Sequence, residues 1–405
     1  MITSETLSQV VASQRRGLAA LELGVKRECA KALDLGLPYA LVLTGIRRCG
    51  KSTLLRQLMR RAKSPQYYFN FDDSRIAGFE AGDFWKLDAA LVAEYGKCSN
   101  YFLDEVQSAP GWELFARTKL DEGKKFVITG SNASLLGREL GTKLTGRHLD
   151  HELFPFSYGE MLALTGKKPG PASFGEYLEE GGFPEYLKDG LPQALQELFS
   201  DVISRDILVR HKIRNAKTAR EMALYLLSNA GKEFSYNGLK KTFSLGSANS
   251  AISFVSHFED SYLLFTIPKF DYSLKKQLVN QKKAYSIDNG LSNANSASFS
   301  KDRGRMLENA VFLRLRSRHR NIFYYRQGGE CDFLVKERER ITKAVQVCYK
   351  LDEDNKAREI GGMAAALEEF GLHSGIILTM DQDDEFTVGK KKITVKQAWK
   401  WMLED

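Results

Sequence analysis

The segment Gly45–Ser52, which reads GIRRCGKS, constrains the fold of this chain more than any other feature. It matches the pattern G-x-x-x-x-G-K-[ST], follows a continuously apolar run at 39–44 and precedes a stretch at 52–61 with helical composition. In that context the glycines let the backbone turn tightly, so that consecutive N–H groups and the helix N-terminus point at phosphate oxygens. The sequence therefore predicts a buried strand, a phosphate-binding loop and a helix.

The residue types of this loop suggest roles for its side chains. The ammonium group of Lys51 is expected to reach the β- and γ-phosphates of a nucleotide, and the hydroxyl of Ser52 to coordinate Mg²⁺. ATP and Mg²⁺ are the cofactors that the motif implies. The residues expected to bind the nucleotide are Gly45, Arg47, Arg48, Cys49, Gly50, Lys51, Ser52 and Thr53.

A second motif, YFLDE at 101–105, completes the predicted site. Three apolar residues bring a strand to its C-terminal end, where ligands bind in open α/β sheets. There Asp104 would hold Mg²⁺ through its water shell, and Glu105 would act as general base on the attacking water. A plain strand end is the alternative for such a motif taken alone, but its position about 50 residues after a phosphate loop favours hydrolysis.

Polar residues also follow the next apolar run, 126–129. Ser131 or Asn132 would lie beside the γ-phosphate and orient the water, although Gly-Ser-Asn is equally ordinary turn chemistry. Three arginines are candidates for stabilising the transition-state charge, within the chain or across a subunit interface, although each taken singly is more often a surface residue. They are Arg138, Arg147 and Arg205.

Short apolar runs recur along the first part of the chain, separated by segments long enough for crossover helices. The runs are 39–44, 66–71, 101–104 and 126–129. They predict an α/β doubly wound parallel sheet over roughly the first 155 residues. Helical spacing of apolar residues predicts a lead-in helix at 15–35.

The length of the chain and its cysteine content limit the classes of protein to which it could belong. At 405 residues the chain is expected to form two or three domains. Its five cysteines are scattered and form no C-x-x-C pair, so neither a disulfide framework nor a zinc site is indicated. Residues 1–14 lack the layout of a signal peptide and no apolar run is long enough for a membrane span, so a cytoplasmic protein without membrane contact is expected.

The net charge of +8 is concentrated in one segment. Residues 205–283 contain 14 Lys and Arg against 6 Asp and Glu, whereas the other 326 residues hold 45 of each sign. Such a concentration suits a polyanion, because each neutralised phosphate releases condensed counterions. A solvated basic face that maintains solubility is an equally good interpretation of the charge alone.

The same segment has three helical patterns followed by two strand patterns. The expected helices are 217–229, 236–243 and 248–258, and the expected hairpin strands are 262–267 and 282–287. This order predicts a winged helix-turn-helix. A polar linker is expected at 292–300, and from Asp302 onward the order helix, three strands, helix, strand predicts a second small α/β unit.

Six strings, considered together, indicate a family. They are LTGIRRCGKSTLL (43–55), YFLDEVQ (101–107), FVITGSNASLL (126–136), LTGRH (144–148), ELFPFSYGEML (152–162) and GGFPEYL (181–187). They resemble prokaryotic AAA+-like ATPases, over most of the chain and most specifically over its first 190 residues. The resemblance implies an AAA+-like P-loop ATPase domain with a helical lid at 1–205, a winged helix-turn-helix at 206–288 and a degenerate PD-(D/E)xK (restriction-endonuclease-like) domain at 289–405.

Further roles follow from the resemblance by position. It implies the sensor position for Ser131 or Asn132 and an arginine finger at Arg147. Because AAA+ relatives usually act as rings, it also implies a homo-oligomer.

The implied nuclease-like fold positions a helix Glu, a strand Asp and (D/E)-x-K on the next strand, so that carboxylates bind Mg²⁺ and the lysine helps to activate water. The corresponding residues are Glu308, Asp332 and Gln346, with Cys348 in place of the lysine and Lys350 two residues further on. Loss of an anionic ligand weakens a hard-cation site, which favours a remnant that recognises DNA shape over a working nuclease. A structural role for a buried Asp332 is a third interpretation.

The sequence as a whole predicts Mg²⁺-dependent ATP hydrolysis coupled to binding or remodelling of nucleic acid, with DNA as the expected partner. The expected nucleic-acid contacts are Lys240, Lys241, Lys275 and Lys276. One alternative is a signalling or assembly switch that binds a protein. The other is a metal-dependent nuclease gated by ATP.

Overall fold

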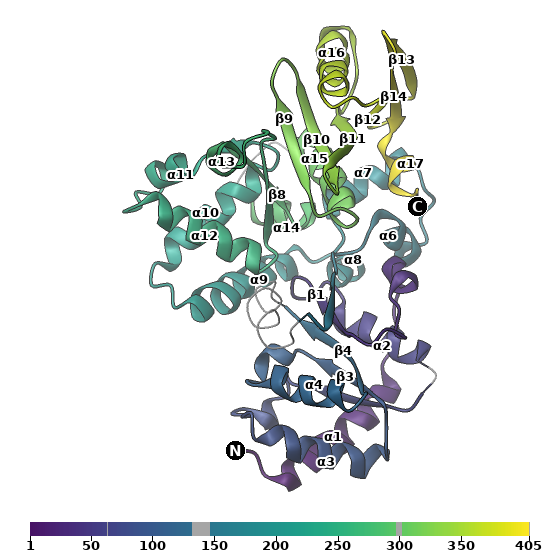
Figure 1. The fold of residues 1–405 in the computed structure, drawn as a ribbon, viewed down its shortest axis with the longest axis vertical. Helices are drawn as coiled ribbons and strands as arrows, with labels where there is room; N and C mark the ends of the chain where they lie inside the picture. Colours follow the sequence, from purple (N-terminus) through teal and green to yellow (C-terminus); the bar gives the residue numbers. More distant parts are fainter. Residues whose placement is uncertain (63, 132–145, 297–301, 405) are drawn as a thin grey trace. The chain divides into compact units, whose positions relative to one another are not determined.

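The computed structural model describes residues 1–62, 64–131, 146–296 and 302–404 (Figure 1). The chain divides into two compact units, Met1–Leu153 and Phe154–Asp405. The boundaries expected at 205 and 288 both fall inside the second unit.

The first unit is built on a five-stranded sheet in which all neighbouring strands are parallel. Its order is β2 (Gln66–Asn70), β3 (Asn100–Asp104), β4 (Lys125–Gly130), β1 (Ala40–Thr44) and β5 (His148–Glu152). Strand β4 therefore lies between the strand that leads into GIRRCGKS and the strand that carries Asp104. This order confirms the predicted parallel α/β sheet, and it brings the ends of β1, β3 and β4, where site residues are predicted, side by side.

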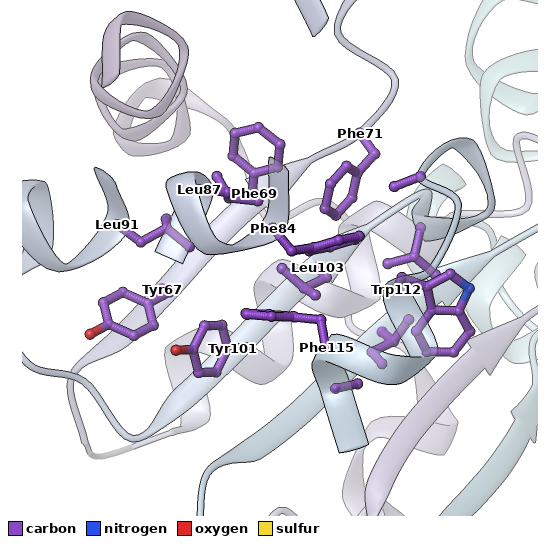
Figure 2. Packing of buried hydrophobic residues seen from close by; sticks show 14 of the residues in the cluster. Tyr67, Phe69, Phe71, Phe84, Leu87, Leu91, Tyr101, Leu103, Trp112 and Phe115 are labelled. Atoms are coloured by element: carbon purple, nitrogen blue, oxygen red, sulfur yellow. The ribbon is translucent and has the colours of Figure 1, made fainter. Parts of the chain in front are cut away.

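Helices α1 (Ser4–Ala20), α3 (Asp83–Tyr95) and α4 (Trp112–Asp121) share one hydrophobic cluster with the sheet. Alternate residues of β2 and β3, such as Tyr67 and Tyr101, point into it, because successive side chains of a strand face opposite sides. Figure 2 shows its aromatic centre, where Phe84 and Phe115 stack with ring centroids 5.0 Å apart. Helix α2 (Lys51–Arg61) contacts β3 and β4 and buries its own leucines.

Two elements of this unit differ from expectation. The helix expected at 15–35 was only partly right, since α1 spans Ser4–Ala20 and the next helical element is a short 3-10 helix, Glu28–Ala32. Between them Gly24 adopts a positive φ of 57°, and the amide of Gln57 donates to the carbonyl oxygens of Leu23 and Val25, which holds the chain extended along α2. Strand β5 was not expected, because its sequence HLDHE is polar.

The second unit begins with a series of helices. They are α6 (Tyr158–Thr165), α7 (Pro171–Glu180), α8 (Pro184–Asp189), α9 (Pro192–Asp201), a π-helix (Val202–Val209), α10 (Ala216–Ser228), α11 (Tyr236–Thr242) and α12 (Ala248–Asp260). The predicted hairpin is confirmed, since β7 (Leu264–Pro268) and β8 (Lys282–Ser286) pair antiparallel. Strand β6 (Glu233–Phe234) pairs with β8 on its other side, and α13 (Leu274–Val279) lies in the connection from β7 to β8.

The rest of the second unit forms a six-stranded mixed sheet in the order β13, β14, β12, β11, β10, β9. Its strands are β9 (Ile322–Arg326), β10 (Glu330–Glu337), β11 (Arg340–Val347), β12 (Ser374–Thr379), β13 (Asp384–Val388) and β14 (Lys391–Gln397). The accompanying helices are α15 (Arg303–Arg316), α16 (Glu353–Glu369) and α17 (Ala398–Met402). The last hairpin and α17 were not expected. The linker expected at 292–300 was partly wrong, since α14 spans Asn289–Asn295, and 297–301 lies outside the described residues.

Candidate functional site

The loop between β1 and α2 depends on glycine at both ends. Gly45 has a φ of 152°, and a Cβ added there would lie 2.1 Å from the carbonyl oxygen of Leu153. Gly50 has a φ of 100°, which a residue with a side chain rarely adopts. Arg48, between them, also has a positive φ, 62°. The tight turn that the motif predicts is therefore present, and it ends where α2 begins at Lys51.

The ammonium group of Lys51 lies against the loop. The residue is 4% exposed, and its Nζ donates to the carbonyl oxygens of Gly45 at 3.2 Å and Ile46 at 3.1 Å. It also forms an ion pair with Oε1 of Glu105 at 3.7 Å. The positive charge of Lys51 is thus held against the loop carbonyls and next to Glu105, the predicted general base.

Asp104 is almost fully buried at the end of β3, with 1% of its surface exposed. It accepts hydrogen bonds from the hydroxyls of Thr129 and Ser52. Burial raises the pKa of its carboxyl, and the two hydrogen bonds oppose that rise. A serine hydroxyl and a carboxylate in direct contact are hard oxygen ligands, so these two side chains fit a Mg²⁺ ion.

Glu105 is held in an unusual conformation directly after β3, with a φ of 53°. Its backbone N–H donates to the hydroxyl of Thr129 at 2.9 Å. The amide of Gln107 donates to Oε2 of Glu105 and, at 3.2 Å, to the hydroxyl of Ser131. The sequence analysis predicted no role for Gln107 or Thr129, although both lie inside strings that it recognised, 101–107 and 126–136.

Arg27, for which the sequence analysis predicted no role, also contacts the loop. Arg27 is 3% exposed, and its guanidinium donates to the carbonyl oxygen of Cys49 at 2.7 Å. Its backbone N–H donates to Gln57 of α2 at 3.1 Å. Cys49 is itself fully buried, and burial raises the pKa of its thiol. No local pattern around residue 27 indicated this contact.

The remaining predicted loop residues differ in exposure. Arg47 is half-buried and Arg48 is exposed, whereas the hydroxyl of Thr53 accepts a hydrogen bond from Arg56 at 3.1 Å. Ser131 is buried at the end of β4.

The contacts of the predicted arginines can be given only for Arg147 and Arg205. Asn132 and Arg138 lie outside the described residues. Arg147 is exposed and pairs with Asp121, and Arg205 of the second unit pairs with Asp201 at 3.4 Å.

In the second unit, the three residues of the implied nuclease-like site do come together. Glu308 of α15 and Asp332 of β10 both contact the ammonium group of Lys283 of β8, at 3.2 Å and 2.9 Å. The side-chain oxygen of Gln346 of β11 accepts a hydrogen bond from the backbone N–H of Asp332 at 2.9 Å. Cys348 donates its thiol hydrogen to the carbonyl oxygen of Lys350.

The four lysines proposed for nucleic-acid contact lie in two places in the second unit. Lys240 and Lys241 lie in the last turn of α11, and Lys275 and Lys276 lie on α13. Lys241, Lys275 and Lys276 are exposed and Lys240 is half-buried.

Two histidines and an aspartate form another group with metal-binding atom types. His211, His257 and Asp260 each place a ligand atom within 4.8 Å of the others, and the two imidazole rings stack with centroids 3.7 Å apart.

The first unit belongs to a known class of domain. Residues 38–162 match the AAA domain family, and the parallel sheet and phosphate loop agree with that match. The first unit is therefore an AAA-type P-loop ATPase domain. Residues 171–302 match a domain of unknown function, DUF8612. Among the described residues, none of the helices is long and apolar enough to cross a membrane.

The chain belongs to the same family as the uncharacterized protein MJ1544 of Methanocaldococcus jannaschii. The two are 33% identical over 396 residues, which cover 89% of this chain and 88% of that protein. An uncharacterized protein of Haemophilus influenzae is 26% identical over 333 residues, covering 77% of this chain and 83% of that protein. Among solved structures, the Walker-type ATPase PABY2304 of Pyrococcus abyssi is similar with 15% identity and a TM-score of 0.41, over 64% of this chain and 91% of that chain.

Proposed function

We propose that the first unit hydrolyses ATP in a Mg²⁺-dependent reaction at the carboxyl ends of β1, β3 and β4. One observation supports this most strongly. Lys51 and Ser52 at the start of α2 meet Asp104 and Glu105 at the end of β3 in a continuous set of contacts. A lysine beside a glycine loop, a hydroxyl bonded to a buried carboxylate and a second carboxylate next to them are the parts that phosphoryl transfer to water needs.

Each side chain has a distinct role in the proposed reaction. Backbone N–H groups of the loop and the ammonium group of Lys51 bind the phosphates and stabilise the charge that develops on them. Ser52 and Asp104 would hold Mg²⁺, which neutralises phosphate charge when it is bound. Glu105 accepts the proton of the attacking water, and Gln107 keeps the Glu105 carboxylate in place.

Two substitutions test this assignment. Lys51→Ala is expected to abolish retention of ATP in the presence of Mg²⁺. Glu105→Gln is expected to retain ATP and lose turnover by roughly 10²-fold or more, because the amide cannot accept the proton. Lys97→Ala, which removes an exposed lysine, is the control and should behave as wild type in both assays. Turnover in Glu105→Gln comparable to that of wild type would show that another group is the base.

We further propose that turnover is coupled to binding of nucleic acid, with DNA as the partner, through the second unit. Helices α10, α11 and α12 and the hairpin β7–β8 have the order of a winged helix-turn-helix. Lysines lie on α11 and on α13 in the connection of the hairpin. A homo-oligomer is part of this proposal, in which the exposed Arg147 acts as a finger on a neighbouring subunit.

A protein partner is the alternative, and one observation favours it. Large apolar side chains are exposed on and next to α13, namely Tyr272 (76%), Leu274 (69%), Leu278 (63%) and Val279 (73%). Exposed apolar side chains gathered on one element mark interaction sites. ATPase assays with single-stranded, duplex and branched DNA and RNA distinguish the two partners. Stimulation that weakens as salt rises supports nucleic acid, and turnover unaffected by any of these supports a protein.

A further inference from the structure

The cluster formed by Glu308, Asp332 and Gln346 contains a cation of its own. The ammonium group of Lys283 lies between the two carboxylates, 2.9 Å from Oδ1 of Asp332 and 3.2 Å from Oε1 of Glu308. The Lys283 side chain is 6% exposed, and those of Asp332 and Glu308 are 7% and 16% exposed. Burial alone would lower the pKa of Lys283, but the two carboxylates that face it raise it above its usual value.

Both oxygens of Asp332 and one oxygen of Glu308 have donors within the protein. Oε1 of Glu308 also accepts from the hydroxyl of Tyr285 at 2.7 Å. The second oxygen of Asp332, Oδ2, accepts from the backbone N–H of Val347 at 3.1 Å. A buried ion pair is stable only when its remaining hydrogen-bonding groups are satisfied in this way.

Both polar atoms of the Gln346 side chain also have hydrogen-bond partners within the protein. Its oxygen accepts from the backbone N–H of Asp332 at 2.9 Å, and its Nε2 donates to Oε2 of Glu359 at 2.7 Å. The other oxygen of Glu359 accepts from Arg358, at 2.6 Å for the closer nitrogen. The neutral oxygen that could replace the missing acidic ligand is therefore bonded to the backbone.

These contacts do not fit a divalent metal ion. Mg²⁺ requires near-octahedral oxygen ligands at about 2.0–2.1 Å, and here an ammonium group lies at hydrogen-bonding distance from both carboxylates. A metal ion bound between the two carboxylates would have to displace this ammonium group, whose positive charge opposes its approach.

We propose that Lys283 is the built-in cation of this site, so that the second unit holds its carboxylates with an ammonium group in place of a divalent metal and does not cleave nucleic acid. The same residue ties β8 to α15 and β10, and it therefore also stabilises the packing of the three-stranded sheet on these elements. The proposal does not depend on nucleotide turnover by the first unit, so the two can fail separately.

The test is binding of Mn²⁺ alone to the full chain. Lys283→Met keeps the side chain as far as Cε and removes the ammonium group, leaving Glu308 and Asp332 facing each other. This variant should melt at a lower temperature than wild type and be restored by Mn²⁺, with binding at least roughly tenfold tighter than that of wild type. Lys283→Arg keeps the charge and should respond to Mn²⁺ no more than wild type does.

Other results would overturn the proposal. A Lys283→Met variant that folds and ignores Mn²⁺ would show that the ammonium group does not occupy a cation position. If that variant does not fold, titration of wild type and Asp332→Asn with Mn²⁺ decides the matter. Equal binding by the two supports the proposal. Mn²⁺ binding, or DNA cleavage in Mn²⁺, that wild type shows and Asp332→Asn lacks would refute it.

Discussion

At the scale of single residues, the ATPase site is a set of side chains that hold one another in place. Lys51 contacts both the loop carbonyls and Glu105, and these contacts fix the position of its charge against the loop. Such positioning lowers the reorganisation that a reaction needs. Thr129 and Gln107 add hydrogen bonds that fix the two acids of β3.

Gln107→Ala tests the positioning of Glu105. The amide of Gln107 contacts both Glu105 and Ser131, so its removal should leave ATP binding unchanged and lower kcat by roughly tenfold, because the carboxylate loses its orientation. Steady-state kinetics that separate kcat from KM give the readout. Gln9→Ala on the exposed face of α1 is the control. An unchanged kcat would contradict the role given to Gln107.

Thr129→Val tests the buried hydroxyl between the two acids. The substitution keeps the shape of the side chain but leaves the Glu105 N–H without its acceptor and removes a donor to Asp104. The first unit should lose about 1–3 kcal/mol of stability, the usual result of an unsatisfied buried polar group. Hydrogen exchange measured on β3 and β4 reports on this unit alone. Thr118→Val, at an exposed position of α4, should leave exchange unchanged, and equal effects of the two substitutions would contradict the argument.

At the scale of elements, the strand order of the first unit explains how the site is assembled. Parallel strands β1, β3 and β4 end at one edge of the sheet, so the loop, the acids and Thr129 meet there. Strand β5 adds to β1 on its other side, and its continuation at Leu153 passes directly over Gly45. The close passage makes Gly45 a requirement of packing as well as of the turn.

Gly45→Ala tests this close passage. Its Cβ would lie 2.1 Å from the carbonyl oxygen of Leu153, and its φ of 152° is unfavourable for alanine. The expected loss of stability is more than about 2 kcal/mol, together with weaker ATP binding. In contrast, a Cβ added at Gly17 of α1 has no neighbouring atom within 4 Å, so the effect of Gly17→Ala on stability should be neutral or slightly favourable. Similar exchange protection in the two variants would refute the steric argument.

At the scale of the whole molecule, the excess positive charge is only partly available for a partner. Lys283 is buried in an internal ion pair, and Arg205 and Arg210 pair with acidic residues one helical turn away. The exposed lysines of α11 and α13 remain the candidates for contact with a polyanion.

Lys241→Ala should therefore reduce affinity for duplex DNA and make the dependence on salt less steep by about one counterion. Lys390→Ala, at an exposed turn of the six-stranded sheet, is the charge-matched control and should keep the wild-type slope. Filter-binding or anisotropy measurements at several salt concentrations provide the slopes. Identical slopes for the two variants would argue against the DNA-binding surface placed on α11.

The sequence by itself determined the parts of this protein that depend on local pattern. The strand, loop and helix around Gly45–Ser52 and the acids at 104 and 105 were recognised because their chemistry and their flanking apolar runs are contiguous in the chain. The confirmed hairpin at β7–β8 belongs to the same category.

Only the tertiary structure decided which distant residues meet. Strand β5 is too polar to be read as a strand and is defined by its pairing with β1. Gln107 contacts Ser131 at the end of the neighbouring strand β4. Lys283 is buried and not part of the basic surface, because it pairs with two carboxylates of later elements. Such contacts depend on packing between residues far apart in the chain, for which the sequence pattern carries no local signal.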